Sequence, residues 1–511
     1  MPKTSIDSQE HPGAWRGYDM PALIILGTLM LAFGWVGFLA SDDWFYAETA
    51  RSWLRGAPTL HDQFDFRYPH IAPIALSFAV LGVNEFSLLL PTTIYFLALV
   101  VLTYACVTRA FGRSAGLVCA GLLCTTPLFI ETATIALPDN AEVFFMTASI
   151  FLFYFAADGG HARWTLFFSG IAAGLAWGTR ETAAGLILTY AICFLRGYRH
   201  SRSLYAFLVL GFVVVFAGEL GALTSMTGDP LTRYRIDLSH NKSGDSSHAP
   251  PFVADKAGSK LAANVSSQWV VGRWSGLLLH KSSLVVFIAI PATFLLLARR
   301  RPRFPAEDLA RLLLAVGITS FLTTGYALGL ASPRYFLPTT YVAIILVSLW
   351  VTHRLMASRR VGALLVVAVL VASNMVVLYL SNRDPLYAER ALLTFVAGTS
   401  ETVYTDPATA KAITFFLERA QLGGRVSGAV PPPNSLYFYN VRKAAKGFGH
   451  GTSFDPARYT PAGTWREVWR FDPEIRYSSK ILAWLRLDHL LPRAIAAKLG
   501  PLESVSVLRT P

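Results

Sequence analysis

Charged residues and cysteines are both scarce in this sequence. Asp, Glu, Lys and Arg make up 15% of the 511 residues, against 53% hydrophobic residues, which is the composition of a polytopic membrane protein. The four cysteines, Cys106, Cys119, Cys124 and Cys193, all lie within apolar runs. Because the polar segments between those runs contain no cysteine, a disulfide framework outside the membrane is excluded.

Motifs for nucleotide and zinc binding are also missing. The sequence has no P-loop, no glycine-rich dinucleotide fingerprint and no Cys/His pattern of a zinc site. A reaction that starts from a nucleotide bound in the cytosol is therefore not expected. Internal repeats are absent as well, which counts against a transporter built from duplicated halves.

The net charge of +13 arises from Lys and Arg residues in short loops rather than on one continuous face. This distribution predicts a membrane topology and no nucleic-acid partner. The apolar runs predict an α-helical polytopic membrane protein with about eleven transmembrane helices. These spans lie at 21–40, 86–108, 114–136, 141–157, 164–179, 182–196, 204–226, 277–298, 308–331, 335–352 and 361–381.

Basic residues follow every second span, as expected for loops on the cytoplasmic side. With a cytoplasmic N-terminus, an odd number of spans places the remainder of the chain outside. We therefore expect a transmembrane domain over 1–381, with outer loops at 41–85 and 227–276, and a C-terminal extracytoplasmic domain over 382–511. A strand-like stretch followed by an amphipathic helix at 402–420 favours a small domain of α/β type.

Two adjacent carboxylates stand where the first span ends. Residues 21–40 run directly into Ser41-Asp42-Asp43-Trp44-Phe45-Tyr46-Ala47-Glu48. Carboxylates are costly within the hydrocarbon, and membrane proteins retain them mainly where they face water, pair with a cation or take part in chemistry. The sequence therefore predicts a functional site at the outer membrane surface, although Asp42 would also suit the N-cap of a following helix.

The stretch Asp42-Asp43-Trp44-Phe45-Tyr46-Ala47-Glu48 resembles the Asp-Glu-x-x-Tyr-Ala-Glu signature of membrane glycosyltransferases of the GT-C superfamily. The similarity is strongest to the Rgt-like branch that transfers aminoarabinose or galacturonic acid to lipid A and lipopolysaccharide core, a branch related to protein O-mannosyltransferases. Further similar fragments follow in the same order. They include Gly82-Val83-Asn84-Glu85-Phe86, Ala136-Leu137-Pro138-Asp139, Gly174-Leu175-Ala176-Trp177-Gly178-Thr179-Arg180 and Pro333-Arg334-Tyr335-Phe336-Leu337-Pro338.

The resemblance implies a GT-C fold and transfer of a sugar from a polyprenyl-phosphate donor to a glycan or lipid acceptor, with inversion of the anomeric carbon. The acceptor hydroxyl needs a base, and the motif gives that catalytic role to Asp42. Asp43 replaces the family's glutamate and is expected to support Asp42. Asp139, between the third and fourth spans, is implied to be a second catalytic carboxylate, although it would also suit a helix start.

Charge that develops on the leaving phosphate requires fixed cations. Each candidate arginine could instead anchor its helix at the membrane interface. In the loop that follows the seventh span, Arg233 and Arg235 are expected to be solvated. The side chains that the resemblance implies for substrate binding are Tyr46, Glu48, Arg67, His70, Arg180 and Arg334.

The metal, the sugar and the acceptor stay open. Some relatives use a divalent metal ion, and no spacing among the outer acidic and histidine residues decides the matter. Lipid A, lipopolysaccharide core and other envelope glycans are compatible with the resemblance. A protein O-mannosyltransferase-like enzyme and a lipid-linked sugar flippase or transporter are the alternatives. The expected location is the bacterial inner membrane, with the site and the C-terminal domain on the periplasmic side.

Overall fold

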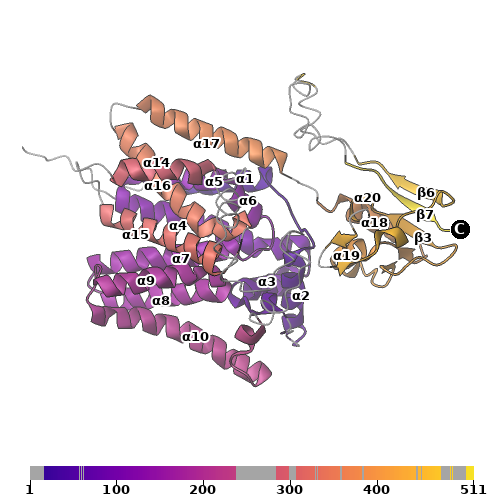
Figure 1. The fold of residues 1–511 in the computed structure, drawn as a ribbon, viewed down its shortest axis with the longest axis horizontal. Coiled ribbons are helices and arrows are strands. Elements are labelled where there is room, and N and C mark those ends of the chain that lie inside the picture. The colour runs from indigo at the N-terminus through magenta and orange to yellow at the C-terminus, as the bar shows by residue number, and fades with distance from the viewer. Residues whose placement is uncertain are drawn as a thin grey trace, which may run out of the picture.

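The computed structural model describes residues 17–236, 284–297, 306–356, 360–381, 385–473, 484, 486 and 502–511, apart from 57, 59, 61, 329, 331, 445–446 and 450–451. Two parts are visible in Figure 1, a bundle of helices and a smaller C-terminal unit built on a sheet. Most of the predicted outer loop at 227–276 lies outside the described residues.

A helix lies at each predicted span, in the predicted order. By length and apolarity, five of the described helices could cross a membrane, or six if a bent pair counts as one span. The number of spans therefore stays a prediction. The bundle helices are α1 Asp19–Phe33, α4 Glu85–Phe111, α5 Arg113–Thr125, α6 Pro127–Ala133, α7 Asp139–Phe155, α8 Ala162–Thr179, α9 Ala184–Arg196, α10 Tyr205–Thr227, α14 Leu284–Leu297, α15 Glu307–Leu322, α16 Leu337–Met356 and α17 Arg360–Leu380.

The third predicted span, 114–136, is a bent pair rather than one straight helix. The axes of α5 and α6 lie at 61° to each other. Pro127 has no N–H to continue the helical hydrogen bonds, and it disfavours helical backbone at Thr126, which is extended with ψ of 117°. The bend brings the end of α6 beside residues 34–84, which connect α1 to α4 and are here named the first outer segment after the predicted outer loop at 41–85. There the N–H of Gly37 donates to the carbonyl of Thr134.

Two glycines allow α8 and α10 to touch through their backbones. A Cβ atom added at Gly170 would lie 1.9 Å from the carbonyl oxygen of Leu208, and one at Gly211 would lie 2.0 Å from that of Phe167. Small residues at such crossings are the usual way for membrane helices to approach closely. The two helices accordingly run side by side at one edge of the bundle (Figure 1).

The first outer segment contains two helices joined by a short 3-10 turn. The helix expected after the carboxylate pair is α2, Asp42–Leu54, and the short apolar helix that follows it is α3, Tyr68–Leu81. Between them lies the 3-10 turn η1, Gln63–Phe66, with Asp62 as its N-cap. Two further 3-10 turns, η3 Glu181–Ala183 and η7 Pro333–Phe336, carry side chains of the candidate site.

The C-terminal unit, defined here as residues 385–473 and 502–511, holds a five-stranded mixed sheet in the order β2-β1-β3-β7-β6. The strands β2, β1 and β3 are parallel, and β7 pairs antiparallel with both β3 and β6. A separate hairpin pairs β4 with β5. The elements are α18 Tyr387–Ala397, β1 Val403–Tyr404, α19 Pro407–Arg419, β2 Val426–Ser427, β3 Leu436–Tyr439, α20 Val441–Ala444, β4 Phe448–Gly449, β5 Thr452–Ser453, β6 Arg466–Phe471 and β7 Val505–Arg509.

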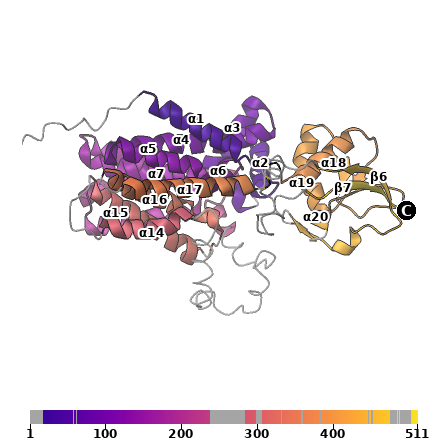
Figure 2. The ribbon, with the colours of Figure 1, turned by 90° about the horizontal axis from the view of Figure 1, so that it is seen from above.

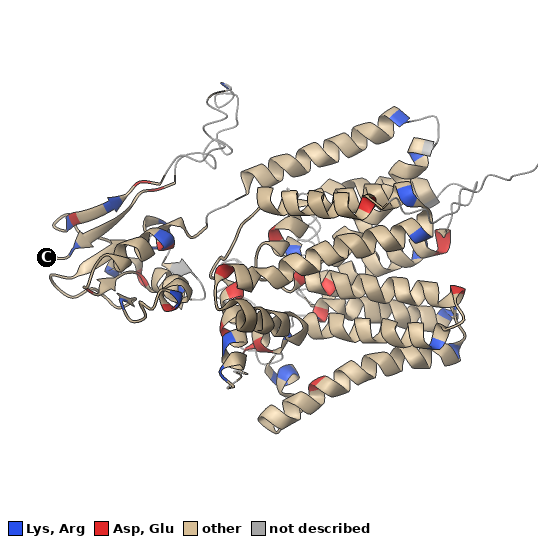
Figure 3. Ribbon diagram, turned by 180° about the vertical axis from the view of Figure 1, so that it is seen from behind, with Lys and Arg blue, Asp and Glu red and all other residues tan. Residues whose placement is uncertain are grey.

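The C-terminal unit rests against the first outer segment at one end of the bundle (Figures 1 and 2). Buried apolar side chains from both parts form one cluster, with Phe38 and Ile74 on one side and Leu392 and Phe416 on the other. Lys and Arg gather at the opposite end of the bundle, where the predicted inner loops lie (Figure 3).

Candidate active site

The chain between α1 and α2 is held in a non-helical course by the carboxylate of Asp43. Its two oxygens accept hydrogen bonds from the backbone N–H groups of Leu39, at 2.6 Å, and Ser41, at 2.7 Å. Between them, Ala40 has a φ of 53°, in the left-handed region that side chains other than glycine rarely adopt. Burial raises the pKa of Asp43 to about 7. Asp43 therefore fixes the backbone that presents Asp42.

Asp42 points into the site and does not cap its helix. The N-cap position of α2 is occupied by Ser41, and no side chain caps the helix there, so the N-cap interpretation of Asp42 is wrong. Instead, Oδ2 of Asp42 accepts a hydrogen bond from Nη2 of Arg334 at 2.5 Å. The same nitrogen lies 3.2 Å from the hydroxyl of Tyr335. About a quarter of the Asp42 side chain is exposed, at 24%.

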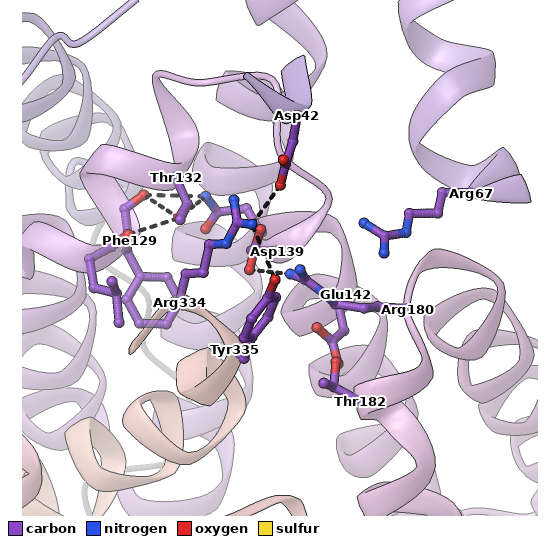
Figure 4. Close-up of polar contacts among 12 residues, drawn as sticks. Asp42, Arg67, Phe129, Thr132, Asp139, Glu142, Arg180, Thr182, Arg334 and Tyr335 are labelled. Atoms are coloured by element: carbon purple, nitrogen blue, oxygen red, sulfur yellow. Dashed lines mark hydrogen bonds and ion pairs between the residues drawn. The ribbon is translucent and has the colours of Figure 1, made fainter. Parts of the chain in front are cut away.

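Asp139 forms a second, more deeply buried ion pair. It begins α7, and one of its oxygens accepts a hydrogen bond from Arg180, which follows the end of α8. The other oxygen, Oδ2, has no hydrogen-bond partner among the described residues. The neighbouring Asn140 donates to the carbonyl of Phe129 and to the hydroxyl of Thr132, which fixes the start of α7 against α6 (Figure 4).

The ring of Tyr335 connects the two ion pairs. The guanidinium carbon of Arg180 lies 4.4 Å from the ring centroid, and that of Arg334 lies 5.1 Å from it. Such distances correspond to cation–π contacts. Figure 4 shows Asp42, Arg334, Tyr335, Arg180 and Asp139 gathered in one region, although they come from four separate parts of the sequence.

Arg67 reaches the same region from the end of η1. It donates to the hydroxyl of Tyr46, and its guanidinium lies over the rings of Tyr46, at 5.8 Å, and Phe64, at 5.5 Å. Arg67 is buried, and its Nε has no hydrogen-bond partner among the described residues. In Figure 4 its side chain is directed toward the space beside Asp42 and Arg180. Tyr46 thus orients Arg67 without neutralising it.

His70 lies behind this group and has the wrong charge for binding phosphate. It is completely buried, and its ring packs edge-on against the ring of Tyr46 with centroids 4.7 Å apart. Burial lowers the pKa of His70 to about 3. At neutral pH the imidazole is therefore uncharged, and its position supports that of Tyr46.

Next to Arg180 lie two further acids, of which Glu142 is buried and Glu181 is partly exposed. Glu142, one turn into α7, accepts a hydrogen bond from the hydroxyl of Thr182 at 2.5 Å. Glu181, between Arg180 and Thr182, instead binds Arg233. Arg180 and Thr182, which flank Glu181, therefore both bind acidic side chains of α7.

Arg233 is buried rather than solvated, so the prediction for this residue is wrong. Its side chain is 1% exposed, and it bridges Glu181 and Glu219, the latter at 2.8 Å. Arg235 is 72% exposed, as expected for a solvated charge. The difference arises because Glu219, which is buried, needs a cation, and the partly exposed Glu181 lies close enough to bind the same guanidinium.

Glu48 is not part of the group. It lies further along α2, where it forms ion pairs with Arg51 at 3.3 Å and Arg55 at 3.8 Å. The structure therefore brings together Asp42, Asp139, Arg67, Arg180 and Arg334 and leaves Glu48 outside.

Sequence reasoning missed several residues of the site. The candidates did not include Tyr335, Glu181 or Thr182. Tyr335 directly follows Arg334, and Glu181 and Thr182 are the two residues after Arg180. A polar Arg-Glu-Thr triplet between two apolar helices was the available signal. Among the described residues, no group of three or more His, Cys, Asp or Glu side chains is arranged to hold a metal ion.

Residues 71–219 match the sequence family of dolichyl-phosphate-mannose-protein mannosyltransferases. No curated protein sequence matches the chain significantly. The fold is similar to that of apo ArnT from Cupriavidus metallidurans, at 12% identity and a TM-score of 0.51, covering 88% of this chain and 95% of ArnT.

Two other solved structures show weaker similarity. One is the same ArnT bound to undecaprenyl phosphate, at 14% identity, with a TM-score of 0.49 and coverage of 84% of this chain and 93% of that one. The other is the oligosaccharyltransferase AglB from Archaeoglobus fulgidus, in complex with an inhibitory peptide and a dolichol-phosphate. It gives 10% identity and a TM-score of 0.45, covering 78% and 63% of the respective chains.

The comparison of folds therefore depends on apo ArnT, which aligns over nearly its whole length. Together with the family match, it confirms the resemblance predicted from the sequence. This chain is a multi-pass membrane protein whose fold is similar to that of ArnT, as its GT-C-like motif predicts, and over residues 71–219 it carries the sequence pattern of the mannosyltransferase family.

Proposed function

We propose that this protein transfers a sugar from a polyprenyl-phosphate donor to an acceptor hydroxyl at the outer face of the membrane. The observation that carries the proposal is the buried guanidinium of Arg67, whose Nε lacks a hydrogen-bond partner among the described residues. Leaving a buried cationic donor unsatisfied is costly, and a lipid phosphate would satisfy it. ArnT, which has a similar fold, also has a solved structure with undecaprenyl phosphate bound.

The reaction needs a base, and Asp42 fits that role. The acceptor hydroxyl gives its proton to Asp42, and its oxygen forms a bond to the anomeric carbon of the donor sugar. The bond from that carbon to the phosphate oxygen breaks, and the electron pair leaves with polyprenyl phosphate. Attack from the side opposite the phosphate inverts the anomeric carbon. Asp42 is partly exposed to an incoming substrate and is held in place by Arg334.

The arginines supply the positive charge that the leaving phosphate requires. Arg67 binds the phosphate directly, and Arg334, which lies between Asp42 and Tyr335, contacts it from the side of the base. Arg180 is partly neutralised by Asp139, so we assign Asp139 to positioning Arg180. The second oxygen of Asp139 is available to accept a hydrogen bond from a hydroxyl group of the sugar.

The acceptor that we propose is lipid A, lipopolysaccharide core or another glycan of a bacterial envelope. This choice follows the branch that the sequence motif resembles, and it places the site on the periplasmic side of the inner membrane. A protein hydroxyl is the second candidate, because the family that matches residues 71–219 is defined by transfer of mannose to protein.

Mass spectrometry of the envelope distinguishes these acceptors. Lipid A, core oligosaccharide and total glycoprotein would be compared between a deletion strain and the same strain that expresses the chain. A single sugar mass that disappears from the glycolipid on deletion and returns on expression would identify sugar and acceptor together. If the sugar is lost from protein instead, the second candidate is correct, and an unchanged glycolipid and glycoprotein profile would contradict the proposal.

Binding of undecaprenyl phosphate to the purified protein tests the role of Arg67. Loss of a charge-assisted hydrogen bond typically weakens binding by about 1.5 to 3 kcal/mol, so Arg67→Met should reduce affinity by about tenfold or more. Arg55→Met is the matched control, because Arg55 belongs to the same outer segment, is 63% exposed and has only a distant ion pair with Glu48. Equal affinities of wild type and Arg67→Met would remove Arg67 from the phosphate site.

A further inference from the structure

The backbone that presents Asp42 is held by groups from both parts of the molecule. Residues 36–51 are here named the Asp42 segment. From the helical bundle, the side chain of Glu85 accepts the N–H of Phe38 at 3.0 Å, and the carbonyl of Thr134 accepts that of Gly37 at 3.1 Å. Within the segment, Asp43 binds two N–H groups shortly before Asp42. The segment therefore depends on groups far from it in sequence.

The C-terminal unit contacts this segment before Asp42. The ring of Phe38 is completely buried, and it packs against Phe415 and Phe416 of α19 with centroids 4.8 Å and 5.6 Å apart. Glu85, which holds the N–H of Phe38, is itself bound by Arg390 of α18 through both oxygens, at 3.0 Å and 2.9 Å. Both contacts fix the position of Phe38, four residues from the base.

The C-terminal unit also contacts the segment after Asp42. The ammonium group of Lys411 lies 4.8 Å from the ring centroid of Trp44 and 4.9 Å from that of Phe45. About two turns further along both helices, Glu418 forms an ion pair with Arg51, whose side chain is only 12% exposed. Helix α19 thus lies along α2, and the two helices are neighbours in Figures 1 and 2.

We infer that the C-terminal unit positions Asp42 for catalysis, through α18 and α19, and that this is a function of the unit in addition to its own fold. The inference is based on the proposed function, in which Asp42 is the base. Errors of about 1 Å in the placement of a catalytic group can reduce a rate by about 100-fold without abolishing substrate binding. Residues of α19 are therefore positioning residues, and their loss should lower turnover more than donor binding.

A charge reversal at the Arg51–Glu418 pair tests the inference. Turnover would be measured as sugar transferred in membranes with equal amounts of protein, and donor-site integrity as affinity for undecaprenyl phosphate. Glu418→Arg places two guanidinium groups together, so turnover should fall by about fivefold or more while affinity stays within about twofold. The double variant Arg51→Glu with Glu418→Arg should restore most of the turnover, because half-exposed Glu48 repels the new carboxylate only weakly.

Lys411 provides a second variant that changes only one half-buried side chain. Lys411→Met keeps the length of the side chain but removes the cation from Trp44 and Phe45, and turnover should fall by about threefold. Lys411→Arg keeps the cation and should retain turnover. The matched control is Arg509→Met, which breaks an ion pair with Glu401 inside the C-terminal unit and should leave turnover unchanged.

The outcomes separate the two proposals. If wild-type protein transfers no sugar, the proposed function fails. If wild-type protein is active and both Glu418→Arg and Lys411→Met keep full turnover, only the positioning role is overturned. A loss of turnover that comes with an equal loss of undecaprenyl phosphate affinity, and that the double variant does not restore, would also overturn it.

Discussion

Asp42 and Asp43 are neighbours with the same side chain and different surroundings. Asp42 is partly exposed and bound to one guanidinium, whereas both oxygens of the buried Asp43 accept backbone N–H groups. A carboxylate whose oxygens are used in this way holds structure, and one with an exposed oxygen can accept a proton from a substrate. Asp42 is therefore suited to act as the base, and Asp43 holds the backbone next to it.

The first prediction concerns the base. Asp42→Asn should lower sugar transfer by about 100-fold or more, since general base catalysis contributes about that much. Affinity for undecaprenyl phosphate should be retained or increased, because Arg334 no longer faces a carboxylate. Transfer assays and lipid binding with the same purified protein would measure both effects. Asp455→Asn, in an exposed part of the C-terminal unit, is the control, and normal transfer by Asp42→Asn would exclude Asp42 as the base.

The second prediction concerns the pH dependence of stability. The pKa of Asp43 is raised to about 7 in the folded protein, from an ordinary value of 3.8. Between about pH 4 and about pH 7 the folded state therefore keeps a proton that the unfolded state has released, so stability decreases as pH rises through this window. Thermal unfolding between pH 5 and pH 8 should show this decrease in wild type and a smaller one in Asp43→Asn.

The control for the pH experiment is Asp472→Asn. Asp472 is exposed, and hydrogen bonds from Ser504 and Arg470 lower its pKa, so it titrates below the window. Its replacement should leave the wild-type slope intact. Identical slopes in wild type and Asp43→Asn would show that Asp43 is ionised at all these pH values.

For single residues, the sequence predicted the acidic residues of the candidate site better than it predicted the arginines that bind them. Asp42 and Asp139 belong to fragments with a recognisable pattern, and the geometry places both beside arginines. Asp42 and Arg334 are 292 residues apart, and no local periodicity links them. The burial of Arg233 was missed for the same reason, because it depends on where α8 and α10 bring Glu181 and Glu219.

At the scale of elements, the crossing of α8 and α10 is set by glycines. Gly211→Ala would place a methyl group 2.0 Å from the carbonyl oxygen of Phe167, so the helices must separate. Overpacking of this kind typically costs about 1 to 3 kcal/mol. Gly218→Ala, on the same helix with nothing within 4 Å of the added atom, is the matched control. Thermal unfolding in detergent should show a loss for Gly211→Ala alone, and equal stabilities would contradict the backbone contact.

The triad of Arg233, Glu181 and Glu219 connects η3 to the segment after α10. Arg233→Met leaves the buried carboxylate of Glu219 without its cation, which should cost about 3 kcal/mol. It should also weaken undecaprenyl phosphate binding, because η3 carries Thr182 and adjoins Arg180. Arg235→Met removes an exposed charge and should change stability by about 0.5 kcal/mol or less. A stable Arg233→Met protein would show that the triad does not hold this segment.

Most helices were predictable from apolar length, whereas their breaks were not. The span at 114–136 contains enough apolar residues for one helix, but Pro127 divides it and turns α6 by 61°. The strand and helix expected at 402–420 occur as β1 and α19. The strand order of the sheet was not readable, because β7 inserts between β3 and β6 by pairings over long separations.

For the whole molecule, the two parts meet around the candidate base. The apolar cluster that includes Phe38 and Ile74 continues into the C-terminal unit through Leu392 and Phe416. Composition alone could separate a membrane part from a polar tail, since the tail has no long apolar run. It could not show that the tail packs against residues at the end of the first span. An amphipathic pattern predicts which face of a helix is buried, but it does not predict which element covers that face.

The distance in sequence between Asp42 and Arg334 has a consequence in time. These two residues are 292 positions apart, and chains are synthesised at about 5 to 20 residues per second. Arg334 is therefore synthesised about 15 to 60 seconds after Asp42, and α19 is synthesised later still. Throughout that interval Asp42, at the start of α2, lacks the guanidinium that holds it in the finished protein, so an active site cannot form before the late parts of the chain are made.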